Sequence, residues 1–112
     1  MSGVALMRLK ITRLAKDLGG QSEIARLLDV DRSRVSRWLT SAGPDRENQQ
    51  KLDALEFVMS RLLQVFGAET ARKWITAVNA HLGNRRPVDL IIANRIAEVI
   101  GAIEQADTGA FA

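Results

Sequence analysis

Apolar residues recur every three or four positions along most of the chain, which is the spacing of one face of an α-helix. The pattern predicts helices over about 4–18, 21–28, 46–66 and 69–82, another from Asp31 to about Ser41, a short helical turn from Pro87 to Ala93, and a last helix through Ile103. No stretch alternates apolar and polar residues for long enough to predict a strand. We therefore expect an all-α fold.

Glycine, proline and aspartate mark the expected helix ends. Gly19 and Gly20 can adopt the left-handed conformation that ends the first helix. Asp31 and Asp45 precede the third and fourth helices, where a carboxylate can accept hydrogen bonds from the free amides of the first turn. Pro87 suits the first position of the short turn, because its missing amide would have no partner there.

Each predicted helix has one apolar face, which we expect to form the core. The inward residues are Leu6, Leu9, Leu14 and Leu18 in the first helix, Leu52, Leu55, Val58, Met59, Leu62, Leu63 and Phe66 in the fourth, Ala71, Trp74, Ile75, Val78 and Leu82 in the fifth, and Ile96, Val99, Ile100 and Ile103 in the last. Phe57 lies outside the stripe of its helix. Isolated exposed apolar residues are common, but we predict that Phe57 lies in the seam of a homodimer.

The chain has 112 residues, of which 46% are apolar and 26% are charged, and it contains no cysteine. This size suits one compact domain or two small helical units that share a core. The missing cysteines exclude disulfides, thiolate zinc sites and cysteine nucleophiles. No apolar run approaches the roughly 20 residues that cross a bilayer, and the segment before Arg8 is too short for a signal-peptide core. We expect a cytoplasmic protein that does not enter membranes.

The sequence offers little support for enzymatic chemistry. His81 is the only histidine, and its position near Trp74 on the helical wheel predicts a partly buried packing residue. Asp29 and Asp31 lack the glycine and the terminal glutamate of a calcium-binding loop. No glycine-rich phosphate loop is present, and nothing brings a nucleophile, a base and an oxyanion donor together. We expect a protein that is not an enzyme and uses no cofactor or metal.

Positive charge is concentrated in the N-terminal part of the chain. Residues 1–46 hold nine Lys and Arg against five Asp and Glu, whereas residues 47–112 hold seven against eight. A polyanionic partner should therefore bind the N-terminal part.

Residues 21–39 resemble the helix-turn-helix of Xre/Cro-type regulators. Ala25 is small where two helices cross closely, and apolar residues occupy the positions that seal a shared core, namely Ile24, Leu28, Val30, Val35 and Trp38. The turn carries Asp29 where such regulators usually have glycine. Aspartate tolerates the left-handed region better than most residues, so the departure is mild.

One face of the third helix is basic and rich in hydroxyl groups. It carries Arg32, Ser33, Ser36, Arg37 and Thr40, with Arg34 at its side and Gln21 at the start of the preceding helix. Arginine can bind guanine through two hydrogen bonds, and the other groups can reach bases or phosphates. We predict that these residues bind operator DNA in the major groove. The alternatives are a helical hairpin with a solvated charged face, and a helix-turn-helix kept only for dimerisation.

The second half of the chain is similar to the toxin-binding domain of the Xre/MbcA/ParS antitoxins. It contains, in the order of that family, a helix with Ala71 and Trp74, a turn with Asn79 and Leu82, the step Pro87-Val88-Asp89-Leu90, and a last helix with Val99. The resemblance covers about half of the chain.

This resemblance implies an antitoxin whose partner is a RES-domain toxin, a family of enzymes that degrade NAD. In that family the C-terminal end of the antitoxin reaches toward the entrance of the toxin's active site. The matching residues here are Gly109, Ala110, Phe111 and Ala112. Phe111 could instead fold back onto its own domain. Arg85 and Arg86 precede Pro87 and are further candidate toxin contacts, with plain solvation as the alternative.

These patterns together predict three regions. They are a helix-turn-helix DNA-binding region over 1–45, a connecting and dimerisation helix over 46–66, and a toxin-binding domain with a tail over 67–112. The predicted function is that of a dimeric antitoxin of a type II toxin–antitoxin system, which occludes the toxin and represses its own operon. Two alternatives stay open: a transcriptional regulator without a toxin partner, and a toxin inhibitor that has lost DNA binding.

Overall fold

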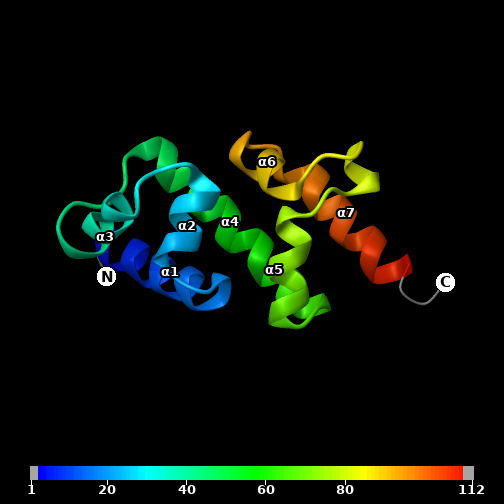
Figure 1. The fold of residues 1–112 in the computed structure, drawn as a ribbon, viewed down its shortest axis with the longest axis horizontal. Helices are drawn as coiled ribbons and strands as arrows, with labels where there is room; N and C mark the ends of the chain where they lie inside the picture. Colours follow the sequence, from blue (N-terminus) through cyan, green and yellow to red (C-terminus); the bar gives the residue numbers. More distant parts are fainter. Residues whose placement is uncertain (1–2, 110–112) are drawn as a thin grey trace. The chain divides into compact units, whose positions relative to one another are not determined.

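The computed structural model describes residues 3–109, which form helices connected by short loops (Figure 1). The chain divides into two compact units, residues 1–56 and 57–112, and the boundary falls within one continuous helix, α4 (Arg46–Val65). The described residues contain seven α-helices, one 3₁₀ turn and no strand, so the predicted all-α fold is confirmed. None of these helices is both long and apolar enough to cross a membrane.

The first unit contains α1 (Gly3–Leu18), α2 (Gln21–Leu28), α3 (Arg32–Thr40) and the first part of α4. Helix α2 packs against both α1 and α3, and α1 also contacts α3. The buried apolar residues of this unit are Met7, Ile11, Leu14, Leu18, Ile24, Ala25, Leu27, Leu28, Val35, Trp38, Leu52, Ala54 and Leu55. They bury the inner face of α3 and leave its outer face to solvent.

The second unit contains the rest of α4, then α5 (Ala68–Thr76), the 3₁₀ turn η1 (Ala80–Leu82), α6 (Pro87–Ile92) and α7 (Ile96–Gly109). Helix α6 packs against α5 and α7, and η1 contacts α7. The buried apolar residues are Val58, Met59, Leu62, Ala71, Ile75, Leu82, Val88, Leu90, Ile91, Val99, Ala102 and Ile103.

Some edges of this second core differ from the prediction. Five residues that the periodicity placed inward are only partly buried, namely Leu63, Phe66, Trp74, Ile96 and Ile100. Leu63, Trp74 and Ile100 lie at the margins of their apolar stripes, where packing against a neighbour covers one side of a residue only. Phe66 follows the end of α4, and Ile96 is the first residue of α7. Helix α7 also continues to Gly109, through residues whose pattern predicted no structure.

The helix ends follow most of the predicted signals. Gly19 has a φ of 100° after α1, Pro87 is the first residue of α6, and the amide of Asn48 donates to Asp45 Oδ2 at 3.4 Å at the start of α4. The prediction for Asp31 is wrong in one respect. Asp31 precedes α3, but its carboxylate makes no capping hydrogen bond, and its backbone carbonyl accepts from the first turn instead.

The inward face of α1 differs from the prediction. Leu6 and Leu9 are 49% and 56% exposed, whereas Met7 and Ile11 are buried together with Leu14 and Leu18. Positions 7, 11, 14 and 18 are spaced by three or four residues and form a narrower stripe than the predicted set. Since the core covers only one side of α1, the two other leucines lie on the surface.

The helix predicted over 69–82 is in fact two elements. Helix α5 ends at Thr76, and Asn79 then forms an antiparallel bridge with Arg85. The side chain of Asn79 also accepts a hydrogen bond from the amide of His81 at 2.9 Å, and asparagine opposes helix continuation by such local bonds. As a result Val78 is 65% exposed instead of buried, and His81 is exposed instead of partly packed.

Candidate functional site

The outer face of α3 carries the side chains that the sequence placed there. Arg32, Ser33, Arg34, Ser36, Arg37 and Thr40 are all exposed, whereas Val35 and Trp38 on the opposite face are buried. Within residues 3–109, no hydrogen bond or ion pair engages the side chains of Arg32, Ser33 or Arg37. This face therefore presents two guanidinium groups and a hydroxyl group that can bind another molecule without first breaking an internal contact.

Two other residues of this face have partners within the protein. Arg34 Nη2 lies 3.6 Å from Asp45 Oδ1, and Thr40 Oγ1 donates to the carbonyl of Ser36 at 3.0 Å. The side-chain amide of Asn48 donates to Asp45 at 2.7 Å, and this hydrogen bond, with a smaller contribution from Arg34, lowers the pKa of the Asp45 carboxyl. Arg34 is thus held beside an ionised carboxylate at the start of α4.

The turn between α2 and α3 has the predicted backbone conformation. Asp29 has φ 56° and ψ 49°, which is left-handed, and its amide donates to the carbonyl of Arg26 at 3.3 Å. The expectation that aspartate replaces glycine here is confirmed. Gln21, the first residue of α2, is half-buried, and no side chain caps the amides of that first turn.

Sequence reasoning missed Arg8, which links α1 to the end of α3. Arg8 Nη2 donates to the backbone carbonyl of Ser41 at 3.1 Å, and Ser41 directly follows α3. One helical turn earlier on α1, Val4 Cγ2 lies 4.0 Å from the position that a Cβ would occupy at Gly43. No local pattern could have marked Arg8, because its partner lies 33 residues away in the sequence.

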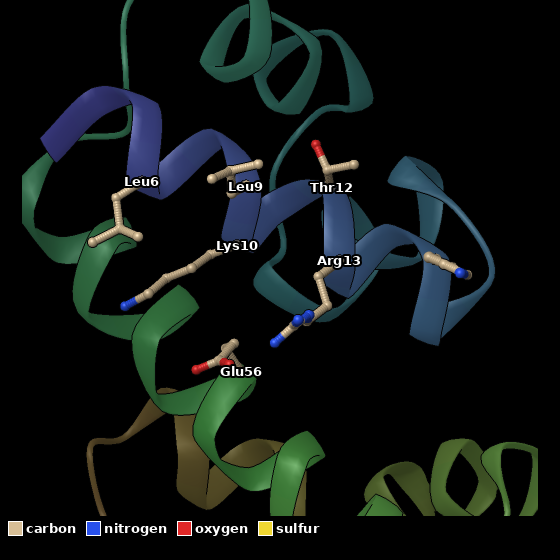
Figure 2. Close-up of a pocket in the computed structure, with 7 residues that line it drawn as sticks. Leu6, Leu9, Lys10, Thr12, Arg13 and Glu56 are labelled. Carbon is tan, nitrogen blue, oxygen red and sulfur yellow. The ribbon is translucent and has the colours of Figure 1, made fainter. Parts of the chain in front are cut away.

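A groove of about 520 Å³ lies along the outer side of α1 (Figure 2). Six lining residues come from α1 and one from α4, namely Leu6, Leu9, Lys10, Thr12, Arg13, Lys16 and Glu56. Arg13 extends toward the side of α4 that carries Glu56 (Figure 2), and Lys10 forms an ion pair with Asp53 at 2.8 Å. The two exposed leucines thus form an apolar surface bordered by cations, separate from the outer face of α3.

In the second unit, Arg85 and Arg86 are exposed but ion-paired within the chain. Arg86 donates two hydrogen bonds to the carboxylate of Asp89, at 2.9 and 2.7 Å, and these lower the pKa of that carboxyl. Arg85 Nη2 lies 3.3 Å from Glu98 Oε2, and its Nε donates to the carbonyl of Leu82 at 2.6 Å. Both guanidinium groups are therefore held in defined positions on the surface.

Val78, which the sequence placed in the core, is 65% exposed and directly precedes the residue that bridges to Arg85. Val78 directly precedes Asn79, whose amide donates to the carbonyl of Arg85 at 3.0 Å. The sequence signal that could have found this exposure is Asn79, because asparagine opposes helix continuation through local hydrogen bonds.

The remaining predicted site residues lie on α4 and at the C-terminal end. Phe57 is 50% exposed on α4, and Gly109 is the last residue of α7. Ala110, Phe111 and Ala112 lie outside the described residues. In the part of the chain that the structure describes, no group of three His, Asp or Glu side chains is arranged to hold a metal ion.

Comparisons with known proteins match the second unit to an antitoxin domain family. Residues 61–105 match the family described as the antitoxin Xre/MbcA/ParS C-terminal toxin-binding domain. The chain is also 28% identical to the mycobacterial cidal antitoxin MbcA of Mycobacterium bovis and of Mycobacterium tuberculosis, over 97% of this chain and 98% of each relative. No solved structure matches the chain. The similarity to MbcA thus extends through the first unit, which carries α3.

Proposed function

We propose, from the match of residues 61–105 to the toxin-binding domain of the Xre/MbcA/ParS antitoxins, that this chain is such an antitoxin, which neutralises a RES-domain toxin and represses its own operon. RES-domain toxins degrade NAD, so the chemistry belongs to the partner and this chain acts by covering it. The proposed location is the cytoplasm, where both the operon and the NAD pool are found. No cofactor is needed for either role.

Toxin binding is assigned to residues 67–112. The observation that carries this assignment is the match of residues 61–105 to a toxin-binding domain. Arg85 and Arg86 are proposed contacts, because a guanidinium group that is already held in place loses less conformational entropy on binding. Val78 is an exposed apolar side chain of the same unit and is a further proposed contact. A toxin surface with carboxylates around an apolar centre would complement this patch.

The tail is proposed to cover the entrance of the toxin's active site. It consists of Gly109, Ala110, Phe111 and Ala112, one aromatic residue among small ones. Aromatic anchors that enter a pocket supply a large share of the binding energy of many interfaces. Phe111 is therefore the tail residue expected to matter most.

Co-expression with the product of the adjacent gene tests toxin neutralisation. The two proteins should copurify, and the antitoxin should preserve cellular NAD. A chain that lacks residues 107–112 should keep its helical circular dichroism but protect NAD poorly. Full protection by the shortened chain would reject the role of the tail. A neighbouring gene without a toxic product would favour a plain transcriptional regulator.

DNA binding is assigned to α2, its turn and α3, as a helix-turn-helix in region 1–45. The supporting observation is that α3 exposes two unpaired guanidinium groups and hydroxyl groups while its other face is held in the core. We assign Arg32, Ser33, Ser36 and Arg37 to base edges, and Gln21, Arg34 and Thr40 to phosphates. Arg34 would exchange Asp45 for a phosphate when DNA binds.

Titration with duplexes from the region upstream of the gene tests this assignment. Arg37→Ala should weaken binding, with a shallower salt dependence if a phosphate contact is lost, or with relaxed base preference if a guanine contact is lost. Lys73→Ala removes one charge from the exposed side of α5 and serves as the control. If the unaltered chain binds none of the duplexes, the protein is a toxin inhibitor without DNA binding.

We also propose that the chain forms a homodimer, with region 46–66 and exposed Phe57 in the seam. A dimer would present two copies of α3 to half-sites about one helical turn of DNA apart. Phe57→Ser should shift the sedimentation coefficient to that of a monomer. An unchanged dimer would place the seam elsewhere.

A further inference from the structure

The segment 41–45 between α3 and α4 is contacted from α1 at two points one helical turn apart. Arg8 Nη2 donates to the carbonyl of Ser41 at 3.1 Å, and Val4 Cγ2 lies 4.0 Å from the position that a Cβ would occupy at Gly43. Residues at i and i+4 share one face of a helix, so a single edge of α1 lies along this segment. The C-terminal end of α3 is therefore positioned by α1 as well as by α2.

Two side chains add hydrogen bonds to backbone carbonyls near the C-terminal end of α3. Thr40 Oγ1 donates to the carbonyl of Ser36 at 3.0 Å, and Ser41 donates to the carbonyl of Arg37 through its amide at 2.9 Å and its Oγ at 3.1 Å. Arg8 then binds the carbonyl of Ser41 itself. A continuous path of hydrogen bonds thus connects α1 to the backbone of Arg37.

The geometry of Arg8 is costly if stability is its only role. Its Nε atom is buried and has no hydrogen-bond partner among the described residues. A buried N–H group without a partner destabilises a fold, and an apolar side chain of similar length would avoid that cost. The cationic group is favourable only through its position at the C-terminal end of α3, where it meets the negative end of the helix dipole.

We propose that Arg8 is a positioning residue for DNA recognition, which fixes the C-terminal end of α3 through Ser41. It holds Arg37 and Ser36 in the orientation that the major groove requires, without touching DNA. The proposal rests on the DNA-binding function proposed above. It differs from a phosphate contact in one measurable way, because a positioning residue contributes no counterion release.

Three variants separate this role from a loss of charge. Arg8→Met removes the donor but keeps an apolar stem of similar length, and Arg8→Lys keeps a cationic donor. Arg13→Met is the matched control, because Arg13 is an exposed arginine of the same helix that lines the groove of Figure 2 instead of contacting segment 41–45. Thermal melts followed by circular dichroism show whether each variant is folded.

The affinity of the full chain for duplexes from its own upstream region is measured at several salt concentrations. Arg8→Met should weaken binding about tenfold, the loss expected for one displaced base contact, with an unchanged salt slope. Arg13→Met should stay within about twofold, and Arg8→Lys should recover most of the affinity. Hydrogen exchange of amides in 36–45 should be faster in Arg8→Met than in Arg13→Met, with or without DNA.

Equal affinities of Arg8→Met and Arg13→Met would overturn the proposal, and so would a salt slope reduced by about one in Arg8→Met, which marks a direct phosphate contact. If Arg8→Met does not fold, Arg8→Lys decides: near-original affinity supports positioning, and tenfold loss in a folded protein refutes it. If the unaltered chain binds no duplex, both the proposed DNA binding and the role proposed for Arg8 are refuted. Binding by the unaltered chain without any effect at Arg8 refutes the inference alone.

Discussion

Apart from glycines, the residues that adopt a left-handed backbone conformation in this chain are short and polar. Among residues 3–109 these are Asp29, Asn84 and Asn94, with φ values of 56°, 61° and 61°. Aspartate and asparagine accept this conformation because their short side chains can bond to the nearby backbone. Asp29 directly follows α2, whereas Asn84 and Asn94 lie one residue beyond Gly83 and Ala93, the residues that follow η1 and α6.

Asp45 provides a test of charge at a helix start. Hydrogen bonding from Asn48 lowers the pKa of its carboxyl, so ionised Asp45 stabilises the fold above the ordinary aspartate pKa of about 3.9, and this contribution is lost as pH falls through the lowered value. Asp45→Asn should lower the melting temperature by a few degrees at pH 7. Melts between pH 7 and 3 should show this difference shrinking only below about pH 4. A difference that is constant down to pH 3 would contradict the assignment.

Helix α1 has two different apolar faces. Its buried face joins the core of the first unit, and its outer face carries Leu6 and Leu9 beside Lys10 and Arg13. A third edge of the helix contacts the segment after α3 through Arg8. A helix that is used on three sides cannot be assigned one inward face from its composition.

Substitution of two leucines tests the difference between the buried and the outer face of α1. Leu14 is 1% exposed and Leu9 is 56% exposed, on the same helix. Leu14→Ala should lower the free energy of unfolding by about 2–5 kcal/mol, because it leaves a cavity in the core. Leu9→Ala should change it by at most about 0.5 kcal/mol. Urea denaturation of both variants provides the measurement, and equal losses would show that the outer face of α1 is buried.

At the scale of the whole molecule, the two units that carry the proposed roles differ in how their surface arginines are paired. Among the described residues, the guanidinium groups of Arg32 and Arg37 on α3 have no partner, whereas Arg85, Arg86 and Arg95 in the second unit are paired with Asp89 or Glu98. Unpaired cations suit a polyanion such as DNA. Arginines that are already fixed beside carboxylates suit a protein surface of defined shape.

This separation predicts variants that lose one function and keep the other. Arg37→Ala should relieve repression of the operon about tenfold or more while it protects cells from the toxin as well as the unaltered chain does. Removal of residues 107–112 should do the reverse. A reporter gene behind the upstream region and a growth assay with the toxin measure the two effects. If either variant lost both activities to the same degree while folded, the two roles would share one surface.

Much of the candidate site was predictable, but its partners were not. The positions of Arg32, Ser33 and Arg37 on one face follow from the helical repeat of 3.6 residues, and the buried positions of Val35 and Trp38 confirm the orientation. The ion pair of Arg34 with Asp45 and that of Arg85 with Glu98 were not predictable. They join residues whose separation in space depends on how the helices pack.

The sequence by itself determined the helices, most of their ends and the resemblance to the antitoxins, because helical periodicity, capping and left-handed turns depend on residues within a few positions of one another. Only the tertiary structure decided which face of α1 is buried, where α5 stops, and that Arg8 reaches Ser41. Those outcomes depend on contacts between distant segments, and a local pattern that is compatible with two packings cannot select between them.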